Sequence, residues 1–275
     1  MTSLALLLVA CTTDDGGLAD TDLTSERTLD NCGGTVSADV PEPYATWFLC
    51  ADVAVVDGYL NVYSSNLPPH PSPYYPTDSD NYVEFDTRTG EWHQNPNTIA
   101  AQELLLSIPL EPTAKGITVT EALVDVEAGT SDEEFRTDWQ GVTVDGTALF
   151  AGVAAPGDDI MEEEYTFDVY EGHPQNTGVY HHHGTNPAAV AVAEAVGEPD
   201  VEFYGLMCDG TVVLGCDEPD GTAVDAADLD AQSGHVATLV GPDGTTWFTD
   251  RYHAHACDDF GRTLAPEIAY YSDGC

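Results

Sequence analysis

The sequence predicts a mainly β fold, a sandwich-like domain of antiparallel sheets built from an internal duplication. Short runs rich in β-branched and aromatic residues alternate with turns rich in Gly, Pro and Asp, which is the pattern of successive strands. A set of short motifs occurs twice, in the same order, in the second half of the chain. Start and stop signals predict a short helix near 187–196.

The first expected folded unit is a β-hairpin within residues 44–65. Two apolar runs flank the dipeptide Asp57-Gly58, which is typical of a type I′ hairpin turn. Further short strands are expected at 82–85 and, from its β-branched content, at 117–126.

The duplicated units span about 141–183 and 205–255. Each contains an Asp-Gly-Thr turn, then an Asp-x-x-x-Gly-His loop, then a Tyr-His-x-His strand. These motifs start at Asp145, Asp168 and Tyr180 in the first unit, and at Asp209, Asp230 and Tyr252 in the second. Any one match could arise by chance, but three in the same order indicate a duplication.

The expected helix lies between the two units. Asn186 is a suitable N-cap residue, Pro187 suits the first helical position, and Gly197 stands just past the end.

The charge balance limits the classes of partner. Six Lys and Arg residues face 49 Asp and Glu residues, for a formal net charge of −43. Because this field repels phosphate backbones, we expect no nucleic-acid partner. Solubility or a saline habitat accounts for the acidity more simply than a dedicated cation-binding function. No sequence feature identifies a protein or small-molecule partner.

Residues 1–10 are expected to be a lipoprotein-like signal peptide. The apolar run ends in Leu8-Val9-Ala10-Cys11, which resembles a bacterial lipobox. Cys11 would then carry lipid and anchor the protein to a membrane of the bacterial cell envelope, facing the periplasm or the exterior. The alternatives are a plain secretory signal cleaved elsewhere, or a buried strand. Residues 11–43 are acidic and predict a disordered tether, and residues 44–275 form the domain.

Six cysteines follow Cys11, and an even number in an exported chain predicts disulfides. The sequence cannot choose among the 15 possible pairings. Pairing of neighbours closes the shortest loops and would join Cys32 with Cys50, Cys208 with Cys216, and Cys257 with Cys275. The absence of a CxxC pair disfavours a thiolate zinc site.

Two His-x-His strands predict a metal site. Alternate side chains of a strand share one face, so His181 and His183 lie together, as do His253 and His255. If the units pack around a pseudo-two-fold axis with these strands beside it, four imidazoles converge. Imidazole ligands favour a transition metal ion, and copper or zinc is expected.

Further candidates surround this predicted site. His173 and His235, each preceded by Gly, are additional ligands or orienting groups, and His70 is a weaker candidate. Asp168 and Asp230 are carboxylates that could hydrogen-bond the imidazoles and set their tautomers. The alternative is a buried hydrogen-bonded ladder of histidines and tyrosines without metal.

The remaining aromatic residues of these strands have simpler roles. Tyr180 and Tyr252 are expected to pack in the core, and His182 is expected to be solvent-facing or a core residue.

Several of these motifs together resemble the YHYH-domain family of exported proteins. They are Ser65-Asn66-x-Pro68-x-His70, Asn95-Pro96-Asn97-Thr98, Asp145-Gly146, Asp168-x-x-x-Gly172-His173, both Tyr-His-x-His strands, and Phe203-Tyr204-Gly205-x-x-x-Asp209-Gly210. The resemblance covers about residues 44–275 and implies a domain without an assigned activity. The second Tyr of the name-giving motif is His182 in one copy and Ala254 in the other.

Three functions follow from these patterns. The first is a lipid-anchored, exported domain that binds a transition metal through the two His-x-His strands. The second is a metal-dependent enzyme at the same site, either a copper oxidase or a metal-assisted hydrolase, for which no catalytic residue can be named. The third is a cell-surface structural or interaction protein whose histidines are purely structural. An open coordination position would distinguish the second from the first.

Overall fold

The computed structural model describes residue 29 and residues 32–88, 90–124, 131–136, 138–155, 158–272 and 274. The predicted leader, Cys11 and the first part of the predicted tether lie outside this part of the chain. Among the described helices, none has the length and apolar character needed to cross a membrane.

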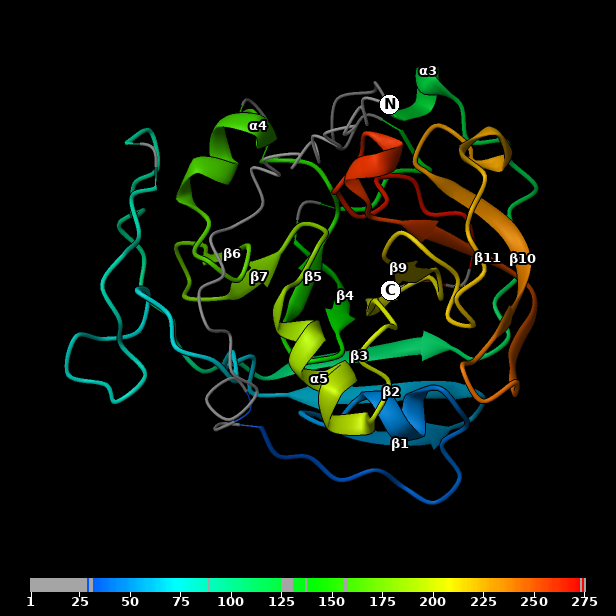
Figure 1. Ribbon diagram of the computed structural model, residues 1–275, viewed down its shortest axis with the longest axis horizontal. Helices are drawn as coiled ribbons and strands as arrows, with labels where there is room; N and C mark the ends of the chain where they lie inside the picture. The colour runs from blue at the N-terminus through cyan, green and yellow to red at the C-terminus, as the bar shows by residue number, and fades with distance from the viewer. Residues whose placement is uncertain are drawn as a thin grey trace, which may run out of the picture.

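Two β-sheets dominate the fold, so the expected mainly β architecture with antiparallel sheets is confirmed (Figure 1). The small sheet has the order β1-β2-β3, with strands β1 (Asp52–Val56), β2 (Tyr59–Ser64) and β3 (Leu104–Pro109). The large sheet has the order β10-β11-β9-β8-β4-β5-β7-β6. Its strands are β4 (Trp139–Thr143), β5 (Ala148–Phe150), β6 (Gly172–Pro174), β7 (Tyr180–His182), β8 (Phe203–Met207), β9 (Val212–Leu214), β10 (Gly234–Val240) and β11 (Thr246–His255).

The helices are short and connect or flank the strands. The α-helices are α2 (Tyr44–Trp47), α3 (Glu121–Val124), α4 (Ile160–Glu163) and α5 (Ala188–Val196). The 3-10 turns are η1 (Glu164–Thr166), η2 (Ala226–Asp228) and η3 (Asp258–Phe260).

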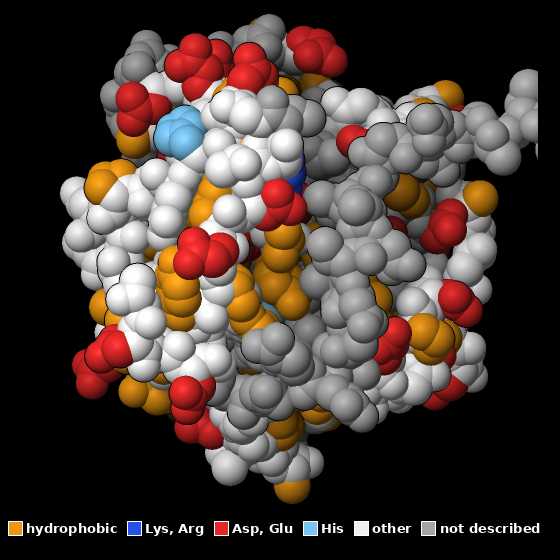
Figure 2. All heavy atoms as spheres, turned by 60° about the vertical axis from the view of Figure 1, so that its left-hand side comes forward, with side chains coloured by type: hydrophobic (Ala, Val, Ile, Leu, Met, Phe, Trp, Pro, Cys, Tyr) orange, Lys and Arg blue, Asp and Glu red, His pale blue; other side chains and the backbone are white. Residues whose placement is uncertain are grey.

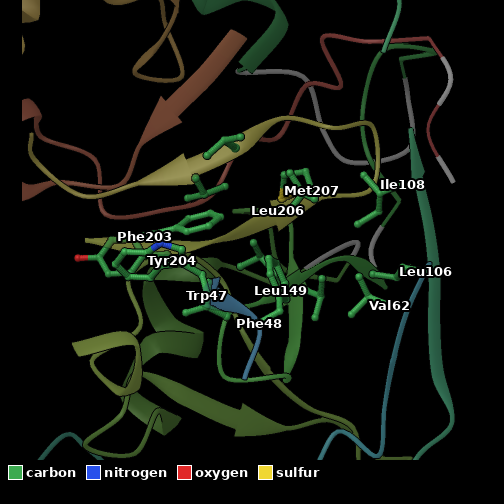
Figure 3. Close-up of a cluster of buried hydrophobic side chains, with 14 of the residues drawn as sticks. Trp47, Phe48, Val62, Leu106, Ile108, Leu149, Phe203, Tyr204, Leu206 and Met207 are labelled. Atoms are coloured by element: carbon green, nitrogen blue, oxygen red, sulfur yellow. The ribbon is translucent and has the colours of Figure 1, made fainter. Parts of the chain in front are cut away.

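An apolar core joins the two sheets (Figure 3). Val62 and Ile108 come from the small sheet, Leu149 and Leu206 from the large one, and Trp47 from α2. All five are buried. Burying a side chain of this size contributes roughly 1.5–3 kcal/mol. The sheets therefore have an apolar core of their own, apart from the histidines described below.

The predicted hairpin and the predicted helix are confirmed. Strands β1 and β2 pair antiparallel around Asp57 and Gly58, whose φ values of 52° and 87° suit a type I′ turn. At the start of α5 the Asn186 side chain accepts a hydrogen bond from the amide of Ala188. At its end Gly197 takes the left-handed conformation that terminates many helices.

Both strands predicted at 82–85 and 117–126 are wrong. Within 82–85 the structure has only an isolated bridge between Ser72 and Tyr82. The described part of 117–126 contains α3 instead of a strand. A segment with strand propensity forms a strand only where it can pack on a pleated sheet surface. The position beside β2 is taken by β3 and by neither of these two segments.

Folded contacts begin before residue 44, inside the predicted tether. The amide of Ser37 donates to the carbonyl of Val53 in β1, and Val40 is buried. The disulfide Cys32–Cys50 ties the same segment to the domain.

The disulfides confirm one neighbour pairing and contradict the other two. Cys32 pairs with Cys50 as expected, but Cys216 pairs with Cys257 across 41 residues. Strands β9 and β11 run parallel with Leu214 opposite His255, so the cysteines two residues further on lie side by side. Cys208 is also disulfide-bonded, and Cys275 lies outside the described residues.

The large sheet has the same strand order when read outward from its centre in either direction. From the central pair β4–β8, the order is β5, β7, β6 on one side and β9, β11, β10 on the other. On each side the inner pair is antiparallel, the next is parallel and the outer pair is antiparallel.

The strand registers follow the same pattern. In the central pair, Val142 faces Leu206, and these two residues occupy equivalent places in the two motif sets. On the outer pairs, His173 faces His181 and His235 faces His253. The pseudo-two-fold axis thus runs between β4 and β8, and the histidine strands lie away from it.

Candidate metal centres

The two His-x-His strands lie in separate clusters. Strands β9, β8, β4 and β5 stand between β11 and β7, which places the arms roughly 24 Å apart along the sheet. Figure 1 shows β7 and β11 on opposite sides of the molecule. The prediction that the four histidines converge on one ion is therefore wrong, because it placed the histidine strands beside the axis. Each arm instead gathers its own ligands.

The first cluster consists of Glu163, His173, His181 and His183. The Nε2 atom of His181 lies 3.1 Å from that of His173 and 3.1 Å from that of His183. An Oε1 atom of Glu163 lies 3.4 Å from His173 Nε2. The three histidines are at most 3% exposed. Three imidazoles and one carboxylate therefore face a common point inside the protein.

Hydrogen bonds identify which ring nitrogens of the first cluster carry hydrogen. Nδ1 of His181 donates to the carbonyl of Val179 at 3.1 Å, and Nδ1 of His183 donates to that of Ala151 at 2.9 Å. A carbonyl only accepts, so both Nδ1 atoms are protonated and both neutral rings present bare Nε2 lone pairs.

The third ring of the first cluster, that of His173, has two contacts at Nδ1. His173 Nδ1 lies 2.6 Å from Thr166 Oγ1, whose own hydrogen is donated to the carbonyl of Glu163 at 2.8 Å. The amide nitrogen of Asn95, a donor, also contacts His173 Nδ1 at 3.4 Å, so Nδ1 either donates to Thr166 or accepts from Asn95.

The repeated motifs explain how the ligands of the first cluster are placed. His173 and His181 are opposite each other on antiparallel β6 and β7, so their side chains share one face. A Cβ on Gly172 would lie 2.5 Å from the Tyr180 hydroxyl, so glycine there lets the tyrosine cross to Asp168. That hydroxyl donates to Asp168 at 2.9 Å. The carboxylate thus holds the tyrosine rather than an imidazole.

The second cluster consists of Glu218, His235, His253 and His255. Oε1 of Glu218 lies 3.1 Å from His235 Nε2, 3.2 Å from His253 Nε2 and 4.0 Å from His255 Nε2. The Nε2 atoms of His255 and His235 are 3.3 Å apart. Here the carboxylate stands among the rings.

Two rings of the second cluster are oriented as in the first. His253 Nδ1 donates to the carbonyl of Arg251 at 3.1 Å, and His255 Nδ1 donates to that of Gly215 at 2.7 Å. Their Nε2 atoms are therefore bare and face the carboxylate of Glu218. A cation or a shared proton is needed to make these contacts favourable.

Beside the second cluster a tyrosine is again hydrogen-bonded to an aspartate, and a disulfide adds a covalent link. The Tyr252 hydroxyl donates to Asp230 at 2.8 Å, and a Cβ on Gly234 would lie 2.0 Å from that hydroxyl. The disulfide Cys216–Cys257 joins the segment that carries Glu218 to the end of β11.

Burial keeps four of the imidazoles neutral at pH 7. It lowers the pKa of His183 and of His255 to about 4, and it holds the pKa values of His173 and His181 well below the usual value. Neutral imidazole is the form that binds metal.

The pKa values of the two carboxyl groups, Glu163 and Glu218, are shifted in opposite directions. Burial, assisted by Asp158, raises the pKa of Glu163 to about 7. Burial also acts to raise the pKa of Glu218, but contacts with His235 and His253 outweigh it and bring that pKa to about 2.

The spacing of the ligand atoms matches that around one transition metal ion. Nitrogen ligands lie ~2.0–2.1 Å from zinc, so two of them are ~3.3 Å apart at a tetrahedral angle and ~2.9 Å apart at a right angle. Six of the separations, at 3.1–3.4 Å, fall at or near this range, and the 4.0 Å between Glu218 Oε1 and His255 Nε2 exceeds it.

The remaining sequence-predicted residues lie elsewhere. His70 and His182 belong to a different buried group with Asp145, here called the inner cluster. Tyr180 and Tyr252 are buried, as expected.

Sequence reasoning missed Glu163 and Glu218. Neither lies in a repeated motif, and among 49 acidic residues no signal singles them out. Two cysteines also lie near Asp259, but the sulfur atoms of Cys216 and Cys257 are joined in a disulfide.

A surface hollow of about 420 Å³ adjoins the first cluster. Glu163 lines it together with Asp158, Asp159 and Glu162. Carboxylates are also spread over the face in Figure 2, where little Lys or Arg colour is visible. The path to the first cluster is therefore acidic and favours cations.

Comparison with known proteins gives one match. The family model described as YHYH protein matches residues 81–227, just over half of the chain. The match includes the first cluster and Glu218 and stops before the remaining ligands of the second cluster. No curated protein and no solved structure matches the chain.

Proposed function

The chain belongs to the YHYH family, and on that premise we propose that it is an exported domain that binds two transition metal ions, one at each outer cluster. Each ion is held by three imidazoles and one carboxylate. Copper and zinc are the ions that suit this donor set best.

One observation supports this proposal above all. In the first cluster the Nδ1 hydrogens of His181 and His183 are donated to the carbonyls of Val179 and Ala151, so two bare Nε2 lone pairs face each other. Lone pairs 3.1 Å apart in a buried site repel each other unless a cation lies between them. A metal-free histidine ladder requires a donor between neighbouring rings, and the pair of His181 and His183 offers none. The purely structural role for the histidines is therefore disfavoured.

Export and lipid anchoring complete the proposal. The disulfides Cys32–Cys50 and Cys216–Cys257 favour an oxidising compartment. We assign Cys11 as the lipidated residue, so that the domain is held at a membrane of the bacterial cell envelope. The matching strand order on both sides of the large sheet supports an origin of the two clusters by internal duplication.

A second candidate function is metal-assisted catalysis at the first cluster. The hollow beside Glu163 supports it, since a ligand that lines both the ion and a surface hollow could leave a position for water or substrate. The two candidate functions differ in whether the ion of the first cluster binds an exchangeable water or small anion at a fifth position.

Metal analysis of separate variants tests the proposal. Untagged protein is stripped with a chelator, reloaded with zinc or copper and analysed for metal per chain. His173→Ala/His181→Ala should lose the ion of the first cluster, and His235→Ala/His253→Ala should lose that of the second. Because the clusters share no ligand, each double variant should keep the ion of the other cluster. The combined variant should lose both ions.

His93→Ala is the matched control, since His93 is exposed and lies outside every cluster. It should retain all metal. Wild-type protein that takes up no ion in the outer clusters after reloading would contradict the proposal. Coupled loss, in which either double variant removes both ions, would contradict two separate sites.

A further inference from the structure

The inner cluster of His70, Asp145 and His182 lies outside both outer clusters. The three residues are at most 1% exposed, and each offers one ligand atom within 4.8 Å of the others. His70 Nε2, His182 Nε2 and Asp145 Oδ2 are buried and have no hydrogen-bond partner among the described residues. Such atoms are rare in folded proteins, and three at one point call for a ligand.

All three atoms are hydrogen-bond acceptors. His70 Nδ1 donates to the carbonyl of Pro71 at 2.9 Å, and His182 Nδ1 donates to the carbonyl of Glu171 at 3.1 Å. Both neutral rings therefore present bare Nε2 lone pairs. The other oxygen of Asp145 accepts from the Thr147 hydroxyl at 2.9 Å, which leaves Oδ2 directed at the rings.

Neither a water molecule nor a proton satisfies this group. Water has two hydrogens and can serve two of three acceptors. A proton shared by two of the groups requires a direct hydrogen bond, and no two of these atoms are in hydrogen-bonding geometry. Three ligands arranged in a plane ~2.1 Å from an ion are ~3.6 Å apart, beyond a hydrogen bond and within the observed 4.8 Å limit.

The equivalent place in the other half is satisfied differently. Ala254 stands where the first half has His182, and Asp209 stands where it has Asp145. There the amide of Tyr271 donates to Asp209 Oδ2 at 3.0 Å. Asp209 Oδ2 thus has a backbone amide as its donor. The equivalent atom in the first half, Asp145 Oδ2, has two imidazoles nearby in place of that amide.

We propose that the inner cluster is a third metal site, which holds one zinc or copper ion through His70 Nε2, His182 Nε2 and Asp145 Oδ2. The ion joins the loop before β3, the turn between β4 and β5, and strand β7. Full burial makes this a structural ion, closed to substrate. Because His182 and the ligands His181 and His183 lie on opposite faces of one strand, the inner ion supports β7 from behind the first cluster.

Total metal per chain tests this site. After reloading with zinc chloride, Asp145→Asn should hold one ion fewer than wild type, because the amide puts a hydrogen-bond donor where the orphaned oxygen was. Asp209→Asn, the matched change in the other half, should lose none. The combined outer-cluster variant should still hold one ion.

Crystals of the reloaded wild type give a readout that does not depend on a variant folding. An anomalous zinc peak between His70 and His182 is expected. The proposal is overturned if that peak is absent, or if folded Asp145→Asn protein holds as much metal as wild type.

Discussion

The two outer clusters share their histidine positions and differ in their carboxylates. In both, the rings come from a Gly-His strand and the adjacent Tyr-His-x-His strand. Glu163 comes from α4 and approaches one ring at 3.4 Å. Glu218 follows β9 and approaches three rings at 3.1–4.0 Å. The repeated motifs thus place the imidazoles, and segments outside these motifs place the carboxylates.

Burial and orientation differ as well. Every ring of the first cluster is buried, and the Nδ1 atom of each ring has a hydrogen-bond partner. In the second cluster the His235 side chain is 18% exposed. The first cluster therefore depends on rings oriented by their neighbours, and the second depends on its carboxylate, which the adjacent disulfide positions.

The carboxylates give the largest expected difference. Glu218→Gln should weaken zinc binding at the second cluster by about 100-fold, or ~2.7 kcal/mol, because it removes the negative charge that lies among three rings. Glu163→Gln should weaken binding at the first cluster by about tenfold. Competition with a fluorescent chelator measures both affinities. Equal losses would contradict the difference in carboxylate roles.

The orientation of His173 gives a smaller effect. Thr166→Val keeps the shape of the side chain but removes the hydroxyl that hydrogen-bonds His173 Nδ1. Loss of such an orienting partner typically costs about 10-fold in metal affinity. The measurement is zinc affinity at the first cluster, with the second cluster of the same protein as the internal control. Unchanged affinity at the first cluster would show that backbone contacts alone orient the rings.

The grouping of histidines within each outer cluster was predictable from the sequence because it is local. Strand alternation puts His181 and His183 on one face, and the Gly-His motif adds His173 on the neighbouring strand. The hairpin at Asp57-Gly58 and helix α5 were predictable for the same reason, since a few adjacent residues determine each turn or cap.

The rest depends on contacts between distant segments. Which strands lie at the pseudo-two-fold axis is set by the pairing of β4 with β8, for which the motifs give no signal. The same applies to the Cys216–Cys257 bridge, which follows from the parallel register of β9 and β11. The inner cluster brings together His70 and His182, more than 100 residues apart in sequence.

The hydrogen bond between Tyr180 and Asp168 beside the first cluster gives the smallest expected effect. This effect is a pH dependence of the free energy of unfolding. Burial raises the pKa of Asp168 to about 6, above the 3.8 of the free side chain. The folded carboxyl therefore keeps a proton that the unfolded chain releases, and this group's contribution to stability falls as pH rises from about 4 to 6. Between pH 5 and 6 the loss is about 1 kcal/mol. Asp168→Asn, which cannot titrate, should lack it.

Urea unfolding of the metal-free wild type and variant at both pH values measures the difference. Changes from other titrating groups cancel when the two proteins are compared, so only the term from Asp168 remains. The wild type should lose about 1 kcal/mol more than Asp168→Asn on going from pH 5 to pH 6. The same pH dependence in both proteins would mean that Asp168 is already ionised at pH 5. Its four hydrogen bonds, from Ser72, Tyr170 and both contacts of Tyr180, would then outweigh its burial.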